Sequence, residues 1–158
     1  MRRWFFLALA LLIASPAFAG LKSGQAAPDF TLKTYDGKSI ALSSLKGKTV
    51  VVAFWWSNTD EPAKFLRFLE GVHKQYAPRG VTVVAVNYDR SRGWGYRIWQ
   101  KEKLSFICVH DADNRVSDAW HVRTHQAVVL DSSLRVVRVV RRATRELKKV
   151  LDAELAKK

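Results

Sequence analysis

Two stretches that are apolar at nearly every position stand out in the middle of the chain. They span residues 49–55 and 81–87. A strand that is covered on both faces has no polar side, so both stretches predict central strands of a sheet. The segment between them carries apolar side chains at helical spacing, namely Leu66, Leu69, Val72 and Tyr76. A helix that joins two buried strands makes them parallel, and the pattern therefore predicts a strand–helix–strand core.

Shorter elements surround this core. Residues 27–32 and 39–42 predict an N-terminal β-hairpin, because the Asp36-Gly37 pair between them suits a tight turn. After the core, the pattern predicts a helix, a strand, a short helix, two strands of an antiparallel hairpin and a closing helix, over residues 91–103, 106–110, 116–120, 127–131, 134–140 and 147–155. The order of elements is that of an α/β domain with a mixed central sheet flanked by helices.

The first nineteen residues are typical of a secretory signal peptide. They begin with the basic Met1-Arg2-Arg3, continue with an apolar run from Trp4 to Ile13, and end with Ala17-Phe18-Ala19. The apolar run is shorter than the roughly 20 residues that a bilayer-spanning helix needs. We expect cleavage after Ala19 and export to the periplasm or the medium, with an uncleaved amphipathic anchor as the alternative. Residues 20–158 contain no linker or repeat and predict one domain.

The chain is strongly basic, with 27 Lys and Arg residues against 14 Asp and Glu residues and a formal net charge of +13. A charge of this size favours acidic protein partners or an anionic membrane surface, and export argues against nucleic acid. Residues 133–158 hold nine cations and three anions. If the last strand is an edge of the sheet, its arginines block edge-to-edge pairing. The alternative is a docking face for an acidic partner or lipid headgroups.

A second basic segment alternates cations with aromatic rings. Its members are Arg90, Arg92, Trp94, Tyr96, Arg97 and Trp99. We expect the rings to pack partly on the sheet while the arginines face water, and contact with an anionic lipid, glycan or peptide stays open.

The only cysteine, Cys108, lies in the apolar run Ser105-Phe106-Ile107-Cys108-Val109. A cysteine in a buried strand behaves as a small apolar residue, and an exported protein usually carries cysteines in pairs. We expect Cys108 to be buried and inert, with a reactive thiol or an intermolecular disulfide as the alternative.

Several segments of the chain, taken together, resemble one protein family. They are residues 25–32, the Asp36-Gly37-Lys38 turn, residues 42–48, Val52-Ala53-Phe54-Trp55 and residues 80–87. Over residues 22–141 the chain is similar to the exported TlpA-like and redoxin (AhpC/TSA-type) branch of the thioredoxin-like superfamily. The resemblance implies a thioredoxin-like fold with an N-terminal β-hairpin extension, and it implies thiol–disulfide exchange or peroxide reduction as the ancestral activity.

This chain departs from the family at the residues that perform that chemistry. The family's two catalytic cysteines fall on Thr59 and Pro62, and its cis-proline would lie near His125-Gln126, where no proline occurs. Disulfide exchange needs one thiolate to attack and a second thiol to resolve the mixed disulfide. We therefore expect no catalytic residue at this turn and no cofactor, and we expect the loop at residue 125 to have a trans peptide bond.

The family's substrate groove is then the candidate binding site. The predicted residues are Trp55, Trp56, Asn58, Thr59, Asp60, Glu61, Phe65, His125 and Gln126. Phe65 and Phe68 are left over from the inward stripe of the helix and either line an apolar patch beside the turn or lie under the N-terminal hairpin. Thr59 is predicted to cap the helix, and Asp60 and Glu61 suit the positive end of its dipole.

Three functions remain open. The leading hypothesis is a non-redox binding or accessory protein that holds a peptide or protein partner in the vestigial groove. The second is residual thiol–disulfide or antioxidant activity through Cys108, which requires an exposed thiol with a lowered pKa. The third is metal handling by His110, His121 and His125, although their spacing is weak evidence and no metal site is our expectation.

Overall fold

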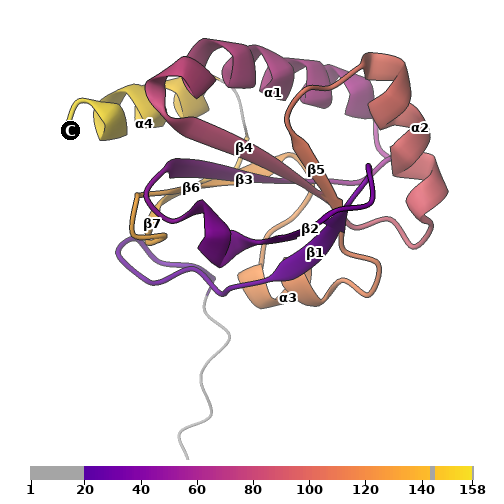
Figure 1. Ribbon diagram of the computed structural model, residues 1–158, viewed down its shortest axis with the longest axis horizontal. Coiled ribbons are helices and arrows are strands. Elements are labelled where there is room, and N and C mark those ends of the chain that lie inside the picture. The colour runs from indigo at the N-terminus through magenta and orange to yellow at the C-terminus, as the bar shows by residue number, and fades with distance from the viewer. Residues whose placement is uncertain (1–19, 143–144, 158) are drawn as a thin grey trace, which may run out of the picture.

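The computed structural model describes residues 20–142 and 145–157. The predicted signal peptide and its cleavage site therefore lie outside the described residues. Among the described residues, no helix has both the length and the apolar character needed to cross a bilayer. The described chain folds as an α/β domain with a seven-stranded mixed sheet, which confirms the predicted thioredoxin-like class (Figure 1).

The strands have the order β2-β1-β5-β4-β3-β6-β7 in the sheet. Their bounds are Thr31–Thr34 (β1), Ser39–Ala41 (β2), Thr49–Trp55 (β3), Val81–Asn87 (β4), Ile107–His110 (β5), Gln126–Leu130 (β6) and Val136–Val140 (β7). β3, β4 and β5 are parallel, and every other pairing between neighbours is antiparallel. The predicted strand–helix–strand core and both predicted hairpins are confirmed.

The helices cover both faces of this sheet. They are α1 (Pro62–Tyr76), α2 (Arg92–Glu102), α3 (Arg115–Trp120) and α4 (Arg145–Leu155), with short 3₁₀ turns η1 (Leu42–Leu45) and η2 (Ala77–Arg79). Figure 1 shows α1 and α4 on one side of the sheet, α3 on the other, and α2 at the right-hand end.

The core consists of two apolar clusters, one on each face of the sheet. Side chains alternate along β3, so Val51, Ala53 and Trp55 face α1 while the residues between them face α3. That alternation explains why this strand is apolar throughout. Among the described residues, both clusters are built from side chains between Leu21 and Leu155.

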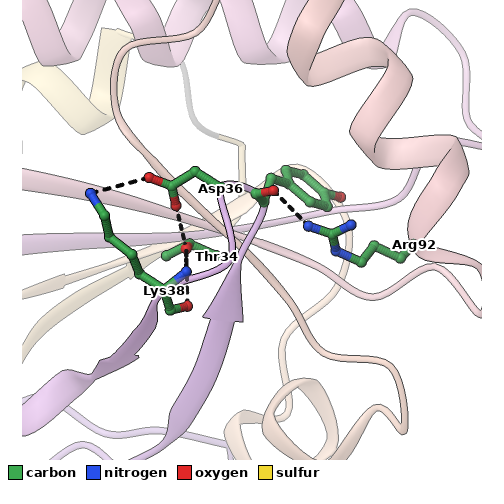
Figure 2. Close-up of polar contacts among 5 residues, drawn as sticks. Thr34, Asp36, Lys38 and Arg92 are labelled. Carbon is green, nitrogen blue, oxygen red and sulfur yellow. Dashed lines mark hydrogen bonds and ion pairs between the residues drawn. The ribbon is translucent and has the colours of Figure 1, made fainter.

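The N-terminal hairpin closes through a polar turn. Gly37 has φ of 92°, a conformation that favours glycine, and the Thr34 amide donates to the Lys38 carbonyl oxygen at 2.8 Å. Figure 2 shows the Asp36 carboxylate between the Thr34 hydroxyl and the Lys38 ammonium. The Lys38 Nζ atom lies 3.3 Å from Asp36 Oδ2. The turn predicted from Asp36-Gly37 is therefore confirmed.

β7 is an edge strand, so the condition under which its arginines would block edge-to-edge pairing is met. The first part of its outer edge is covered by residues 24–27. Gly24 donates its amide to the Val136 carbonyl oxygen at 2.7 Å, and the Val136 amide donates to the Gln25 carbonyl oxygen at 2.8 Å. The N-terminal segment therefore protects this part of the edge from pairing with another chain.

Candidate functional site

A groove of about 720 Å³ lies where α1 begins, beside the loop that enters β6 and the start of α4. It follows the carboxyl end of β3, at the turn where the resemblance places the catalytic cysteines. Its lining combines two phenyl rings with ionisable side chains, and the residues are Asp60, Glu61, Lys64, Phe65, Phe68, His125, Arg142 and Arg145. Four of the predicted binding residues are therefore brought together here, and Phe68 joins them.

The floor of the groove is aromatic. Phe65 is 8% exposed, and its ring centroid lies 4.8 Å from that of His125. Phe68 is partly exposed and packs against the α1-side core cluster. Phe65 and Phe68 therefore line an apolar patch beside the turn, as the first of the two sequence alternatives proposed.

His125 is held at the groove by its backbone. Its amide donates to the Phe54 carbonyl oxygen at 2.9 Å, and its φ of 64° lies in the left-handed region. All peptide bonds of the described residues are trans. Partial burial lowers the pKa of the His125 imidazole, because desolvation penalises the charged form. A neutral ring packed on Phe65 extends the apolar floor.

Charged side chains line the rest of the groove. Glu61 pairs with Lys64 at 2.9 Å, and Asp60 is exposed beside them. Arg142 and Arg145 contribute cations from the α4 side. The groove therefore offers an apolar floor with both signs of charge around it.

The prediction that Thr59 caps α1 is wrong. The helix begins at Pro62, its N-cap residue is Glu61 in a left-handed conformation (φ 53°, ψ 48°), and no side chain caps it. The Thr59 hydroxyl instead donates to the Trp56 carbonyl oxygen at 3.0 Å. The reason is positional, because the segment 57–61 shifts the N-cap from residue 59 to residue 61 and leaves Thr59 out of reach of the free amides of the helix. Pro62 in the first turn needs no amide partner, as expected.

A buried carboxylate that the sequence reasoning missed holds this turn. Asp89 is fully buried, and its carboxylate accepts from the Ser57 amide at 2.9 Å and from Asn87 Nδ2 at 3.0 Å. These bonds tie the end of β4 to the loop that follows β3. The available signal was Asn87 and Asp89, two polar residues at the end of the largely apolar strand β4 and just after it.

The other five predicted binding residues, Thr59 among them, do not line the groove. Trp55 is fully buried in the α1-side core cluster, so a ligand in the groove cannot reach it. Gln126 pairs with Phe54 in the sheet and shares its α3-side orientation, where it lines a different depression. Trp56 is 37% exposed and Asn58 is exposed, but neither lines the groove.

Cys108 lies inside the sheet. It is 3% exposed and is the Cα partner of Ala85 in the neighbouring strand. Burial raises the pKa of its thiol, with a smaller contribution from Glu70. This is the expected inert environment, and it is the opposite of what a reactive thiolate needs.

The histidines considered for metal binding are separated. His110 Nε2 is hydrogen-bonded to the Asp89 carbonyl oxygen at 2.8 Å. His121 lines the depression on the α3 side, whereas His125 lines the groove on the α1 side. Within residues 20–142 and 145–157, no three His, Cys, Asp or Glu side chains are grouped as metal ligands.

Comparison with known proteins gives consistent matches. The AhpC/TSA family matches residues 23–145. The chain is 35% identical over 118 residues to the thiol-disulfide oxidoreductase ResA of Bacillus subtilis, covering 73% of this chain and 66% of ResA. It is 31% identical over 112 residues to the chloroplastic peroxiredoxin Q of Populus jackii, covering 70% of this chain and 52% of that protein. The chain thus spans less than two thirds of the length of these relatives.

Solved structures show the same fold. The thioredoxin domain of a thiol-disulfide oxidoreductase from Bacteroides vulgatus superposes with a TM-score of 0.75 at 22% sequence identity, covering 85% of this chain and 98% of that domain. At this level of identity the likeness speaks for the fold alone.

Proposed function

We propose that this chain, which belongs to the AhpC/TSA family, is an exported non-redox binding or accessory protein that holds a peptide segment of a protein partner in the groove at the start of α1. One observation carries the proposal. The groove has an aromatic floor and a volume of about 720 Å³. Thr59 and Pro62 stand at the positions where the family has its catalytic cysteines. A surface that no longer supports thiol exchange still has the shape and the apolar area to bind.

The absence of thiols from the turn supports a non-redox role. A hydroxyl and a proline ring cannot form or resolve a mixed disulfide. Cys108 does not replace them, because it is buried in β5 and lines a different cavity, between β1 and the end of α2. Residual redox activity through Cys108 therefore has no support from its environment.

The lining of the groove suits an extended peptide. An apolar side chain of the peptide would lie against Phe65, Phe68 and the His125 ring, and its flanking charges would meet the ionisable rim. Because the whole chain carries a net charge of +13 and Arg142 and Arg145 lie on the α4 side of the groove, peptides with acidic residues beside the apolar one are favoured.

Selection from a displayed peptide library, followed by affinity measurement on the best peptide, tests this assignment. Phe68→Ala should weaken binding about tenfold, because it removes apolar contact area at a partly exposed position. Trp94→Ala is the matched control, since it also removes an aromatic ring, and Trp94 does not line the groove. Binding that is unchanged by Phe68→Ala, or that falls equally with Trp94→Ala, would remove the groove from consideration.

Activity assays test the non-redox part separately. The wild type and Cys108→Ser should show equal and negligible rates of insulin reduction and peroxide consumption, because neither carries an accessible thiol. A measurable wild-type rate that disappears in Cys108→Ser would restore the redox alternative. Cell fractionation of the full chain would test export.

A further inference from the structure

Helix α2 is fixed on the sheet by its inner face. Gly95 lies so close to the hairpin that a Cβ there would stand 2.1 Å from Tyr35 Oη and 2.8 Å from Asn87 Oδ1. The rings of Tyr96 and Trp99 lie 5.8 Å and 5.7 Å from the Tyr35 ring. This packing fixes the rotation of the helix about its axis, so the identity of its outer face is fixed as well.

Arg92 belongs to this inner contact. Its guanidinium donates to the Tyr35 carbonyl oxygen at 2.6 Å, as Figure 2 shows, and it lies 5.2 Å from the centroid of the Tyr96 ring. The first cation of α2 is therefore used to hold the helix in place and is not part of the outer face.

The outer face consists of Trp94, Arg97 and Lys101, spaced three and four residues apart. Ile98 does not belong to it, because its side chain packs against the α1-side core cluster. Trp94 is 48% exposed, which makes it the most exposed large apolar side chain of the described residues. Arg97 and Lys101 are exposed. We call these three residues the α2 outer face. A half-exposed tryptophan beside two cations has the composition of side chains that lie at a membrane–water interface.

Cations on this face have no acidic partner in the described part of the protein. Among the residues that the structure describes, neither Arg97 nor Lys101 forms an ion pair, and neither does Arg90 just before the helix. Glu102, the only acidic residue of α2, has a largely buried side chain that pairs with Arg67 at 2.9 Å. The α2 outer face is therefore apolar and positive, with no acidic residue on it.

The shape and composition of this surface decide which partner fits. None of the grooves described above is lined by the α2 outer face, and α2 lies at the right-hand end of the molecule in Figure 1, away from α4. A helix face with tryptophan flanked by basic side chains matches the boundary between lipid headgroups and acyl chains, where the ring enters the interface and the cations meet phosphates. We propose that the α2 outer face docks this protein onto an anionic lipid bilayer.

The proposal is independent of the peptide groove, and vesicle binding tests it. The chain from Gly20 onward, which is the mature form expected after cleavage at Ala19, is used because the apolar run Trp4–Ile13 would itself bind lipid. The probes are vesicles of phosphatidylcholine alone and vesicles with about one-third phosphatidylglycerol, at low and physiological salt. We expect binding to the anionic vesicles only.

Substitutions on the α2 outer face should weaken this binding. Arg97→Gln with Lys101→Gln should lower the partition coefficient about 25-fold, since each cation near an anionic surface contributes roughly fivefold. Trp94→Ala should lower it about tenfold, and Trp94→Phe should keep most of it. Brominated lipid should quench part of the wild-type fluorescence, and this part should be missing in Trp94→Phe.

A matched control separates docking from general attraction of a basic protein. Lys46→Gln with Lys48→Gln removes the same charge from exposed residues before β3. If this control weakens binding as much as the α2 double variant, or if Trp94 is not quenched, the docking proposal is overturned. The docking proposal is also overturned if the protein does not bind vesicles, whether or not the same face captures an acidic protein. Far-ultraviolet circular dichroism confirms that each variant is folded.

Discussion

Replacing Gly95 with alanine should destabilise the fold, although this change is usually favourable inside a helix. Alanine in place of glycine gains about 1 kcal/mol in helix propensity. At Gly95, however, the new Cβ would stand 2.1 Å from the Tyr35 hydroxyl oxygen and 2.8 Å from Asn87 Oδ1. Relief requires Tyr35 or the helix to move by roughly 1 Å, because ordinary Cβ contacts lie beyond about 3.4 Å.

The magnitude follows from what would have to move. Tyr35 is buried and packed against Tyr96 and Trp99, so moving its ring disturbs these aromatic contacts. Overpacking of such a site costs about 1–3 kcal/mol, and we expect the upper end here. After the gain in helix propensity, the free energy of unfolding should fall by about 2 kcal/mol, and the melting temperature should fall by about 4–8 °C for a chain of this size.

Urea unfolding followed by circular dichroism measures this change, and the chain supplies two controls. Gly93 is in the same helix, and a Cβ there would meet only Ser91 Oγ at 3.7 Å, so Gly93→Ala should stabilise by about 0.5–1 kcal/mol. Tyr35→Phe removes the oxygen that causes the clash. That oxygen is buried without a hydrogen-bond partner among the described residues, so its removal alone should be nearly neutral.

The double variant Gly95→Ala with Tyr35→Phe should recover about 1 kcal/mol of the loss, since the contact with Asn87 remains. The reasoning is refuted if Gly95→Ala is as stable as Gly93→Ala, or if Tyr35→Phe recovers nothing. Either result would mean that α2 does not lie against the hairpin as described, and the orientation of the α2 outer face would then be in doubt.

Two further predictions concern titratable side chains. Burial lowers the pKa of His125 below its ordinary value of 6.5, so the unfolded chain holds more protons on this residue at acidic pH. The contribution of His125 to stability is therefore present above pH 6.5 and is lost as the pH falls below that value. The free energy of unfolding of His125→Gln should depend less steeply on pH between pH 8 and pH 5, and equal slopes would contradict this. Cys108 should not react with an aromatic disulfide reagent until the protein is unfolded in guanidinium, and Cys108→Ser should cost about 1–3 kcal/mol because it buries a hydroxyl in an apolar strand; rapid reaction of the native thiol would show that the strand opens.

The sequence predicted the elements whose signal is local. The strands β3 and β4 could be placed because both faces of each are covered, so their apolar runs have no polar interruption. The hairpin turn could be placed because Asp36-Gly37 needs no distant contact to favour it. The burial of Cys108 followed from its apolar neighbours in the same way.

The candidate site was harder to predict because its members come from distant segments. Phe65 could be singled out as surplus to the inward stripe of its helix, but its contact with His125 depends on how the loop before β6 meets α1. Gln126 was misplaced because the face that a strand residue occupies depends on sheet register, and a shift of one residue reverses it. Trp55 lies on the same side of the sheet as the groove, but it is fully buried in the core. The capping role of Thr59 failed because the helix start depends on a turn that Asp89, just after β4, holds through the Ser57 amide.

By itself the sequence determined that this chain has a thioredoxin-like order of elements and that no thiol stands where the family's catalytic pair would be, because element order and residue identity are properties of the chain alone. Only the tertiary structure decided which side chains share the groove and that Trp94 faces outward. Those outcomes depend on the packing of segments far apart in the chain, above all the close approach of Gly95 to Tyr35, and packing of that kind leaves no local pattern.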